Sequence, residues 1–294
     1  MFRPSVWIAV LVLIVSGFLM MTPGRADLSE LRSGWNADPI WYDGLCEIAT
    51  YKATRVIYGQ PRDYTARVFT NKEQYSPKTT TKASGASGIE VFKHHRRDEV
   101  PTENYTYYFS TMAYLDAGSL GPVKLEMASQ EDCGATFKSL VVEGGRMRYL
   151  QSSYFPGEGI REGDERIDRG VTVFFDGLTL SLRSFPFGSG KVLTLEVVPP
   201  QIDTHLTQVT PVRATVRDVG KEVVSLPIGD IEAHHLVVEL DRAIGGAKRF
   251  DFWFAAEGAY VEGEAGLHML VKHAGPWGQT LELEGIERRA YWLR

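Results

Sequence analysis

Histidine is the residue type in this chain best suited to metal binding or acid–base chemistry. The seven histidines are His94, His95, His205, His234, His235, His268 and His273, and no His-Glu-x-x-His motif occurs. Adjacent residues on a strand point to opposite faces, so neither His94 with His95 nor His234 with His235 can face one interior. A three-ligand site would need one histidine from each of several strands. The pattern favours histidines that are exposed or singly hydrogen-bonded.

Glycine and lysine at residues 187–192, "FGSGKV", resemble part of a phosphate-binding loop. A complete P-loop has a glycine separated by four residues from its Gly-Lys pair, followed by Ser or Thr and a helix. Here Phe185 occupies the glycine position, Val192 follows the lysine, and the next residues read as a strand. We expect no nucleotide and no other cofactor.

Acidic residues are dense over 156–170, where Glu158, Glu162, Asp164, Glu165 and Asp168 could offer carboxylates to calcium. The order of an EF-hand is absent and three arginines lie among them, which favours a mobile, solvated loop with local ion pairs. The run "HHRRDE" at 94–99 is similarly interpreted as a wet turn at the end of a strand. No Gly-x-Ser-x-Gly elbow is present. The sequence therefore offers no catalytic, cofactor-binding or metal-ligating residue, and we expect no enzyme activity.

The only two cysteines are Cys46 and Cys133. In an exported chain, two cysteines indicate a possible disulfide. The alternative is a pair of buried thiols, because free cysteine packs as a small hydrophobic residue.

The N-terminus predicts export. Arg3 precedes an apolar run over residues 6–21, and a small residue, Ala26, ends the segment, which is the layout of a secretory signal peptide over residues 1–26. The run is shorter than the ~20 residues needed to span a bilayer, so we expect cleavage and a periplasmic protein without a transmembrane segment. Residues 27–294 carry 30 basic and 37 acidic residues, a net charge of −7, which disfavours nucleic acid as a partner.

Period-two alternation dominates the rest of the chain. It is clear at 178–183, 193–197, 212–217 and 280–286, and it predicts strands with one buried face. Asp176-Gly177 and Gly144-Gly145 lie between apolar runs and predict hairpins. About 14 to 17 strand candidates with few helix signals predict an all-β protein, built as a large curved antiparallel sheet or half-barrel. We favour one domain over 27–294, with a possible seam near 199–211. A long loop is expected at 76–88.

Aromatic residues are frequent, with 14 Phe, 13 Tyr and 6 Trp. Most are expected to form a core, but a strongly curved sheet can also enclose an apolar trough that holds a ligand. Sequence does not distinguish a filled interior from an open one.

Three segments carry a resemblance to a known group of proteins: the stretch from "WYDGLCEIATYKATRVIYG" onward, "FDGLTLSLRSFPFGSGKVLTLEVVPP", and the C-terminal "KRFDFWFAAEGAYVEGEA". They resemble an uncharacterised family of exported β-rich proteins from Gram-negative bacteria, a periplasmic domain of unknown function. The resemblance implies a curved sheet similar to lipoprotein-carrier half-barrels. It transfers no catalytic residue.

These features lead to three hypotheses. The first is a non-catalytic periplasmic protein that binds a lipid or other apolar ligand, or a cell-envelope partner, on a curved sheet. The second is an envelope hydrolase or carbohydrate-active enzyme whose site is built from loops. The third is a structural or assembly protein that uses exposed strand edges.

Overall fold

The structure, a computed structural model, describes residues 28–31, 34–85, 87–261, 267–276 and 278–293, so the expected signal peptide lies outside the described residues. The strands are β1 (Cys46–Ile57), β2 (Gln60–Ser76), β3 (Thr81–Lys82), β4 (Ile89–Pro101), β5 (Thr106–Asp116), β6 (Pro122–Glu131), β7 (Gly134–Glu143), β8 (Arg146–Ser153), β9 (Gly159–Arg166), β10 (Thr172–Phe174), β11 (Val192–Val198), β12 (Val212–Leu226), β13 (Gly229–Ile244), β14 (Ala247–Ala255), β15 (Leu270–Ala274) and β16 (Thr280–Arg289). The helical elements of the described chain are one α-turn, α1 (Leu178–Ser181), and the 3-10 turns η1 (Leu28–Leu31), η2 (Trp35–Ala37), η3 (Pro39–Tyr42), η4 (Phe175–Gly177) and η5 (Leu182–Ser184).

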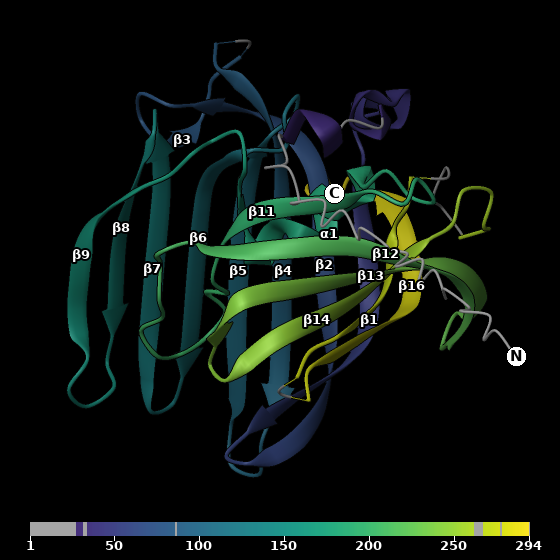
Figure 1. Cartoon of the computed structure of the whole chain (residues 1–294). Coiled ribbons are helices and arrows are strands. Elements are labelled where there is room, and N and C mark those ends of the chain that lie inside the picture. Colours follow the sequence, from purple (N-terminus) through teal and green to yellow (C-terminus); the bar gives the residue numbers. More distant parts are fainter. Residues whose placement is uncertain (1–27, 32–33, 86, 262–266, 277, 294) are drawn as a thin grey trace, which may run out of the picture.

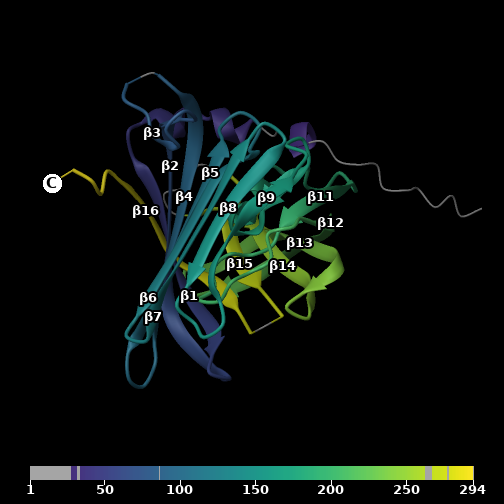
Figure 2. The ribbon, with the colours of Figure 1, turned by 90° about the vertical axis from the view of Figure 1, so that its left-hand side faces the viewer.

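All 16 strands belong to one sheet, in the order β10-β11-β12-β13-β14-β15-β16-β1-β2-β4-β5-β6-β7-β8-β9, with β3 paired to β2. Every pairing is antiparallel except β10 with β11. Figure 1 shows β11–β14 crossing in front of β2, β4 and β5, and Figure 2 shows the same two layers from the side. The sheet therefore curls over itself into a spiral without closing, which confirms the prediction of a large, curved, mostly antiparallel sheet.

Irregular pairing explains where the sheet bends. The register shifts at Thr50/Tyr51 on β1, between Asp218 and Lys221 on β12, and at Trp253/Phe254 on β14. An extra residue in one strand of a pair bends that strand and increases its twist. Further shifts occur between Tyr114 and Leu115 on β5 and between Glu239 and Ile244 on β13, so the irregularities are spread along the sheet.

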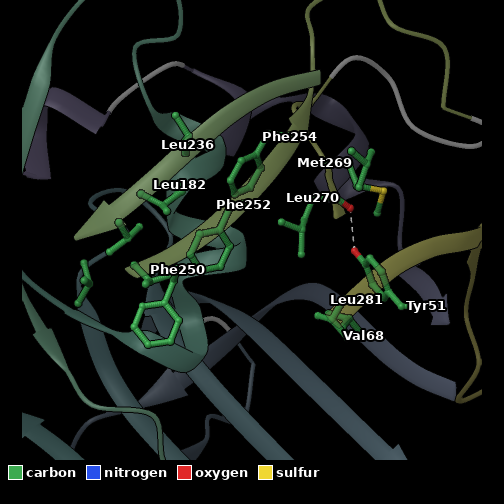
Figure 3. Packing of buried hydrophobic residues seen from close by; sticks show 14 of the residues in the cluster. Tyr51, Val68, Leu182, Leu236, Phe250, Phe252, Phe254, Met269, Leu270 and Leu281 are labelled. Atoms are coloured by element: carbon green, nitrogen blue, oxygen red, sulfur yellow. Dashed lines mark hydrogen bonds between the residues drawn. The ribbon is translucent and has the colours of Figure 1, made fainter. Parts of the chain in front are cut away.

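The main core fills the space between the two layers. Phe250, Phe252 and Phe254 alternate along β14 and point inward, where they meet aliphatic residues of the facing layer. Figure 3 shows Phe252 beside Leu270, and the Tyr51 hydroxyl donating to the Leu270 carbonyl oxygen at 2.9 Å. Burying aromatic side chains of this size supplies much of the driving force for such a fold.

Residues 175–184 form the inner helical segment instead of the predicted hairpin and strand. The alternating leucines suggested one buried face, but this segment is surrounded by the spiral on several sides. A helical turn sends Leu178 and Leu182 into the main core and Leu180 into a second cluster that contains Phe92 and Leu125. The alternation of apolar residues did not distinguish a strand from a helical turn, because both sides of the segment are buried.

Residues 199–211 form an inner strap, which crosses the concave side of β7–β9. Its backbone carbonyls accept from side chains of the sheet: Gln201 O from Lys138 Nζ at 2.9 Å, and Thr204 O from Ser153 Oγ at 3.1 Å. Thr204 O also accepts from Thr136 Oγ1. Polar residues on the concave face thus satisfy a buried stretch of irregular backbone.

The loop expected over 156–170 contains β9, an edge strand of eight residues. Its acidic and basic residues misled the prediction because both faces of an edge strand can be wet, and charges there discourage edge-to-edge association.

The possible disulfide between Cys46 and Cys133 is not formed, and both cysteines are free. Following the paired residues from strand to strand across β1, β2, β4, β5 and β6 leads from Glu47, the neighbour of Cys46, to Leu125. Cys133 follows Leu125 by eight residues, about 26 Å along the strand direction at ~3.3 Å per residue. A disulfide needs Cα atoms within about 7 Å.

Candidate functional site

A cavity of about 430 Å³ lies inside the spiral. Its walls come from the concave faces of β1, β2, β4 and β5, from β14–β16, from the inner helical segment and from the inner strap. Small-molecule sites in proteins typically enclose about 300–1,000 Å³. The β1 residues in its wall run from Glu47 to Val56, a separation of about 30 Å at ~3.3 Å per residue, so the cavity is elongated along β1.

One wall is apolar. Val68 of β2, Leu270 of β15 and Leu281 of β16 line it, together with the Phe252 ring. Figure 3 shows Val68 and Leu281 adjacent, with Leu270 and Phe252 beyond them. This wall offers aliphatic and aromatic surface to a ligand.

A polar row supplied by β4 adjoins this wall, because Val68 pairs directly with Arg96 across β2 and β4. His94, Arg96 and Asp98 alternate inward, while His95, Arg97 and Glu99 point to the convex face. The wet turn expected at 94–99 is therefore wrong: the run lies in the middle of a 13-residue strand. Alternate residues of the run point to opposite faces of the sheet, as expected for a strand. The high charge of the run hid this alternation in the sequence.

Arg96, which lines the cavity, forms an ion pair with Asp98. Arg96 Nη2 lies 2.8 Å from Asp98 Oδ2 and 3.0 Å from the Tyr64 hydroxyl, which itself donates to Asp98 at 3.0 Å. Burial, followed by the Asp98 charge, raises the pKa of Tyr64 above its usual value. The group is thus a fixed arrangement of donors with a partly accessible guanidinium.

His94 is held neutral between two threonines. Its Nδ1 lies 2.8 Å from Thr70 Oγ1 and its Nε2 lies 2.8 Å from Thr179 Oγ1. Burial lowers the pKa of His94 to about 3, and the nearby Arg183 charge acts in the same direction. Neutral imidazole has one donor and one acceptor nitrogen, and two hydroxyls satisfy both.

A second ion pair lies at one end of the cavity, where Arg183 Nη2 is 2.6 Å from Glu47 Oε1 and both side chains are 3% exposed. Asp176 lies on the inner helical segment and accepts from the Gln201 amide at 2.9 Å. Burial raises the pKa of Asp176 above its usual value. One end of the cavity and the β4 row are therefore polar, whereas the β14–β16 side is mostly apolar.

The remaining histidines are dispersed. His273 faces the cavity, stacks on Phe252 and contacts the Asp251 carbonyl oxygen at 2.9 Å, and burial lowers its pKa to about 4. His95 contacts Ser110 on the convex face, His234 pairs with Asp218, His235 with Asp251, and His205 with Glu158. No group of three or more potential metal ligands occurs in the part of the chain that the structure describes.

Glu158, Glu162, Asp164, Glu165 and Asp168, considered above for calcium, do not converge. Asp164 pairs with Arg146 at 2.6 Å, Glu158 holds His205 and the Leu206 amide, and Glu165 accepts from Thr210. Several of these contacts tie β9 to the inner strap. The described helices include none that is long and apolar enough to cross a membrane.

Similarity to known proteins is limited to overall architecture. No protein-family model and no curated protein matches the chain. Among solved structures, the chain is similar to a beta-barrel-like protein of the domain of unknown function DUF1849 from Brucella abortus, with 11% sequence identity and a TM-score of 0.48. The match covers 83% of this chain and 98% of that chain. That protein is described by its architecture alone, so the comparison brings no activity to this chain.

Proposed function

We propose that this protein is an exported, non-catalytic binding protein for a small amphipathic molecule, which it holds inside the spiral. One observation carries the proposal: the elongated cavity of about 430 Å³ combines an apolar wall with a row of fixed polar groups. A trough packed with side chains would have argued for a purely structural role. An elongated site with one apolar wall suits a molecule with an extended tail and a polar end.

The polar groups of the cavity are arranged for binding rather than for catalysis. Asp98 and Glu47 each hold an arginine, and both nitrogens of His94 are bound by threonine hydroxyls. A general base needs a free acceptor within reach of a substrate proton. Preorganised donors that are already oriented reduce the entropic cost of binding.

The first test identifies what the protein carries. The chain is exported to a bacterial periplasm, purified without detergent, extracted with organic solvent and analysed by mass spectrometry beside native mass spectrometry of the intact sample. We expect a stoichiometric amphipathic molecule. A clean unliganded mass, together with no thermal stabilisation by a chain-length series of amphiphiles, would contradict the proposal.

A matched pair of variants locates the site. Val68→Phe adds bulk to the apolar wall, whereas Val223→Phe makes the same change at a position that is 67% exposed. We expect Val68→Phe to weaken binding of the extracted molecule about tenfold or more and Val223→Phe to leave it unchanged. Equal affinities in the two variants would place the ligand elsewhere.

A further inference from the structure

Arg55 is a buried cation in the wall of the cavity. Its side chain extends inward from β1, and the residue is 8% exposed. Nη2 donates to the Ile202 carbonyl oxygen of the inner strap at 3.0 Å, and the guanidinium carbon lies 4.1 Å from the centre of the Phe109 ring. A carbonyl and an aromatic face orient this guanidinium but do not neutralise its charge.

The other two arginines of the cavity differ in this respect. Arg96 is paired with Asp98 and Arg183 with Glu47, whereas Arg55 forms no ion pair with any residue in the described ranges. Asp203 also lines the cavity, but its Oδ1 accepts from the His205 amide and it makes no ion pair with Arg55. Buried arginines are almost always paired, because an uncompensated charge in a dry interior is costly.

Thr111 supplies a second unsatisfied group in the wall of the same cavity. Thr111 is 2% exposed and lines the cavity, and its Oγ1 has no hydrogen-bond partner among the described residues. It is the next inward-facing residue after Phe109 on β5, and it lies directly opposite Arg96 on β4. A buried hydroxyl without a partner is a rare feature that points to a missing acceptor or donor.

We propose that Arg55 and Thr111 bind the anionic oxygen group of the ligand, a carboxylate or a phosphate, and that the apolar wall binds its hydrocarbon tail. This inference rests on the proposed function and specifies the ligand class. An anionic oxygen would neutralise the Arg55 charge and accept from the Thr111 hydroxyl, and Arg96 is the cross-strand partner of Thr111 on β4. Hydrogen bonds between a guanidinium and a charged oxygen are among the strongest in proteins.

The test compares head groups on one tail. Isothermal titration calorimetry of the delipidated protein uses decanoate, decyl phosphate and methyl decanoate. We expect at least one of the two anions to bind about tenfold or more tightly than the neutral ester. The tighter anion identifies whether the natural head group is a carboxylate or a phosphate.

Variants then assign the preference to residues. Arg55→Gln should bring the affinity for the anion down to that for the ester without changing the affinity for the ester, and Arg55→Lys should retain part of the preference. Thr111→Val should reduce anion binding about threefold to tenfold with a folded, equally stable protein, because the lost hydroxyl has no hydrogen-bond partner among the described residues. Arg67→Gln, on the exposed face of β2, is the control and should change nothing.

The outcomes separate the two proposals. If the wild-type protein binds ester and anions equally, the anionic head group is wrong and the binding function stands. If none of the three binds, the proposed function itself is wrong. If Arg55→Gln fails to fold, the wild type and Thr111→Val still test the site. The proposed head-group site is wrong if Thr111→Val keeps the full preference for the anion.

Discussion

The Arg96 guanidinium holds the Asp98 carboxylate through two nitrogens, with Nε at 2.9 Å from Oδ1 and Nη2 at 2.8 Å from Oδ2. The two residues are separated by one position on β4, so both point to the concave side of the sheet. Asp98 is fully enclosed, whereas the Arg96 side chain is 23% exposed. The carboxylate therefore fixes the guanidinium that the cavity presents.

Removing this carboxylate should destabilise the protein strongly. Asp98→Ala leaves a buried guanidinium without its counter-charge, and we expect the free energy of unfolding to fall by about 3–5 kcal/mol. Urea denaturation measures the change. Glu99→Ala is the control, since Glu99 pairs with Arg97 on the convex face and both side chains are about half exposed, where such pairs contribute about 0–1 kcal/mol. Similar losses in the two variants would contradict the assigned burial.

Stability should decrease as the pH falls below about 6.5. Burial lowers the pKa of His94 to about 3 and that of His273 to about 4, whereas both titrate near 6.5 in the unfolded chain. Between these values the unfolded state binds protons that the folded state does not, so each histidine should contribute a slope of up to about 1.4 kcal/mol per pH unit. Urea unfolding at pH 7.5, 6 and 5 measures it. His94→Gln should flatten the slope and His205→Gln, at an exposed position, should not; equal slopes in all three proteins would argue against a neutral buried His94.

The two thiols should react at very different rates. Cys133 is exposed, whereas Cys46 is 0% exposed and burial raises its pKa to about 12. A thiol-specific chromogenic reagent should therefore titrate one thiol in the native protein and two after denaturation, because the thiolate is the reactive form. Cys133→Ser should abolish the fast reaction. A native protein with no reactive thiol, and two only after reduction, would show a disulfide.

The inner strap should show non-additive mutational effects. Ser153 and Thr136 both donate to the Thr204 carbonyl oxygen, so either one can satisfy this acceptor alone. We expect Ser153→Ala and Thr136→Val to cost about 1 kcal/mol or less each, and the double variant to cost about 1–3 kcal/mol more than their sum. A double-mutant cycle in urea measures this coupling. Additive losses would mean that a different group satisfies the carbonyl.

The fold class was predictable because strand periodicity is local. The runs at β11, β12 and β16 alternate over several residues, and a sheet with one wet face imposes that pattern. The inner helical segment was not predictable, because residues 178–183 alternate in the same way and only the surrounding spiral makes them helical. Tertiary packing overrode the local pattern there.

The site was harder to predict than the fold. Arg96 and Thr111 pair directly across β4 and β5, and Arg55 lines the same cavity from β1, which no spacing along the chain reveals. The alternation within residues 94–99 could have placed His94, Arg96 and Asp98 on one face. Its charge instead suggested exposure, since charged residues are rarely buried without partners.

The open ends of the sheet have a mechanical consequence. In the described chain β9 pairs only with β8 and β10 only with β11, so no hydrogen-bonded ladder joins the two ends of the roll. A closed cylinder of fixed strand number has a fixed bore. An open roll can instead widen or tighten through a small change of twist at every strand, while each hydrogen-bonded ladder stays intact. The size of the ligand that fits would then be limited by the inner strap at 199–211 rather than by the sheet.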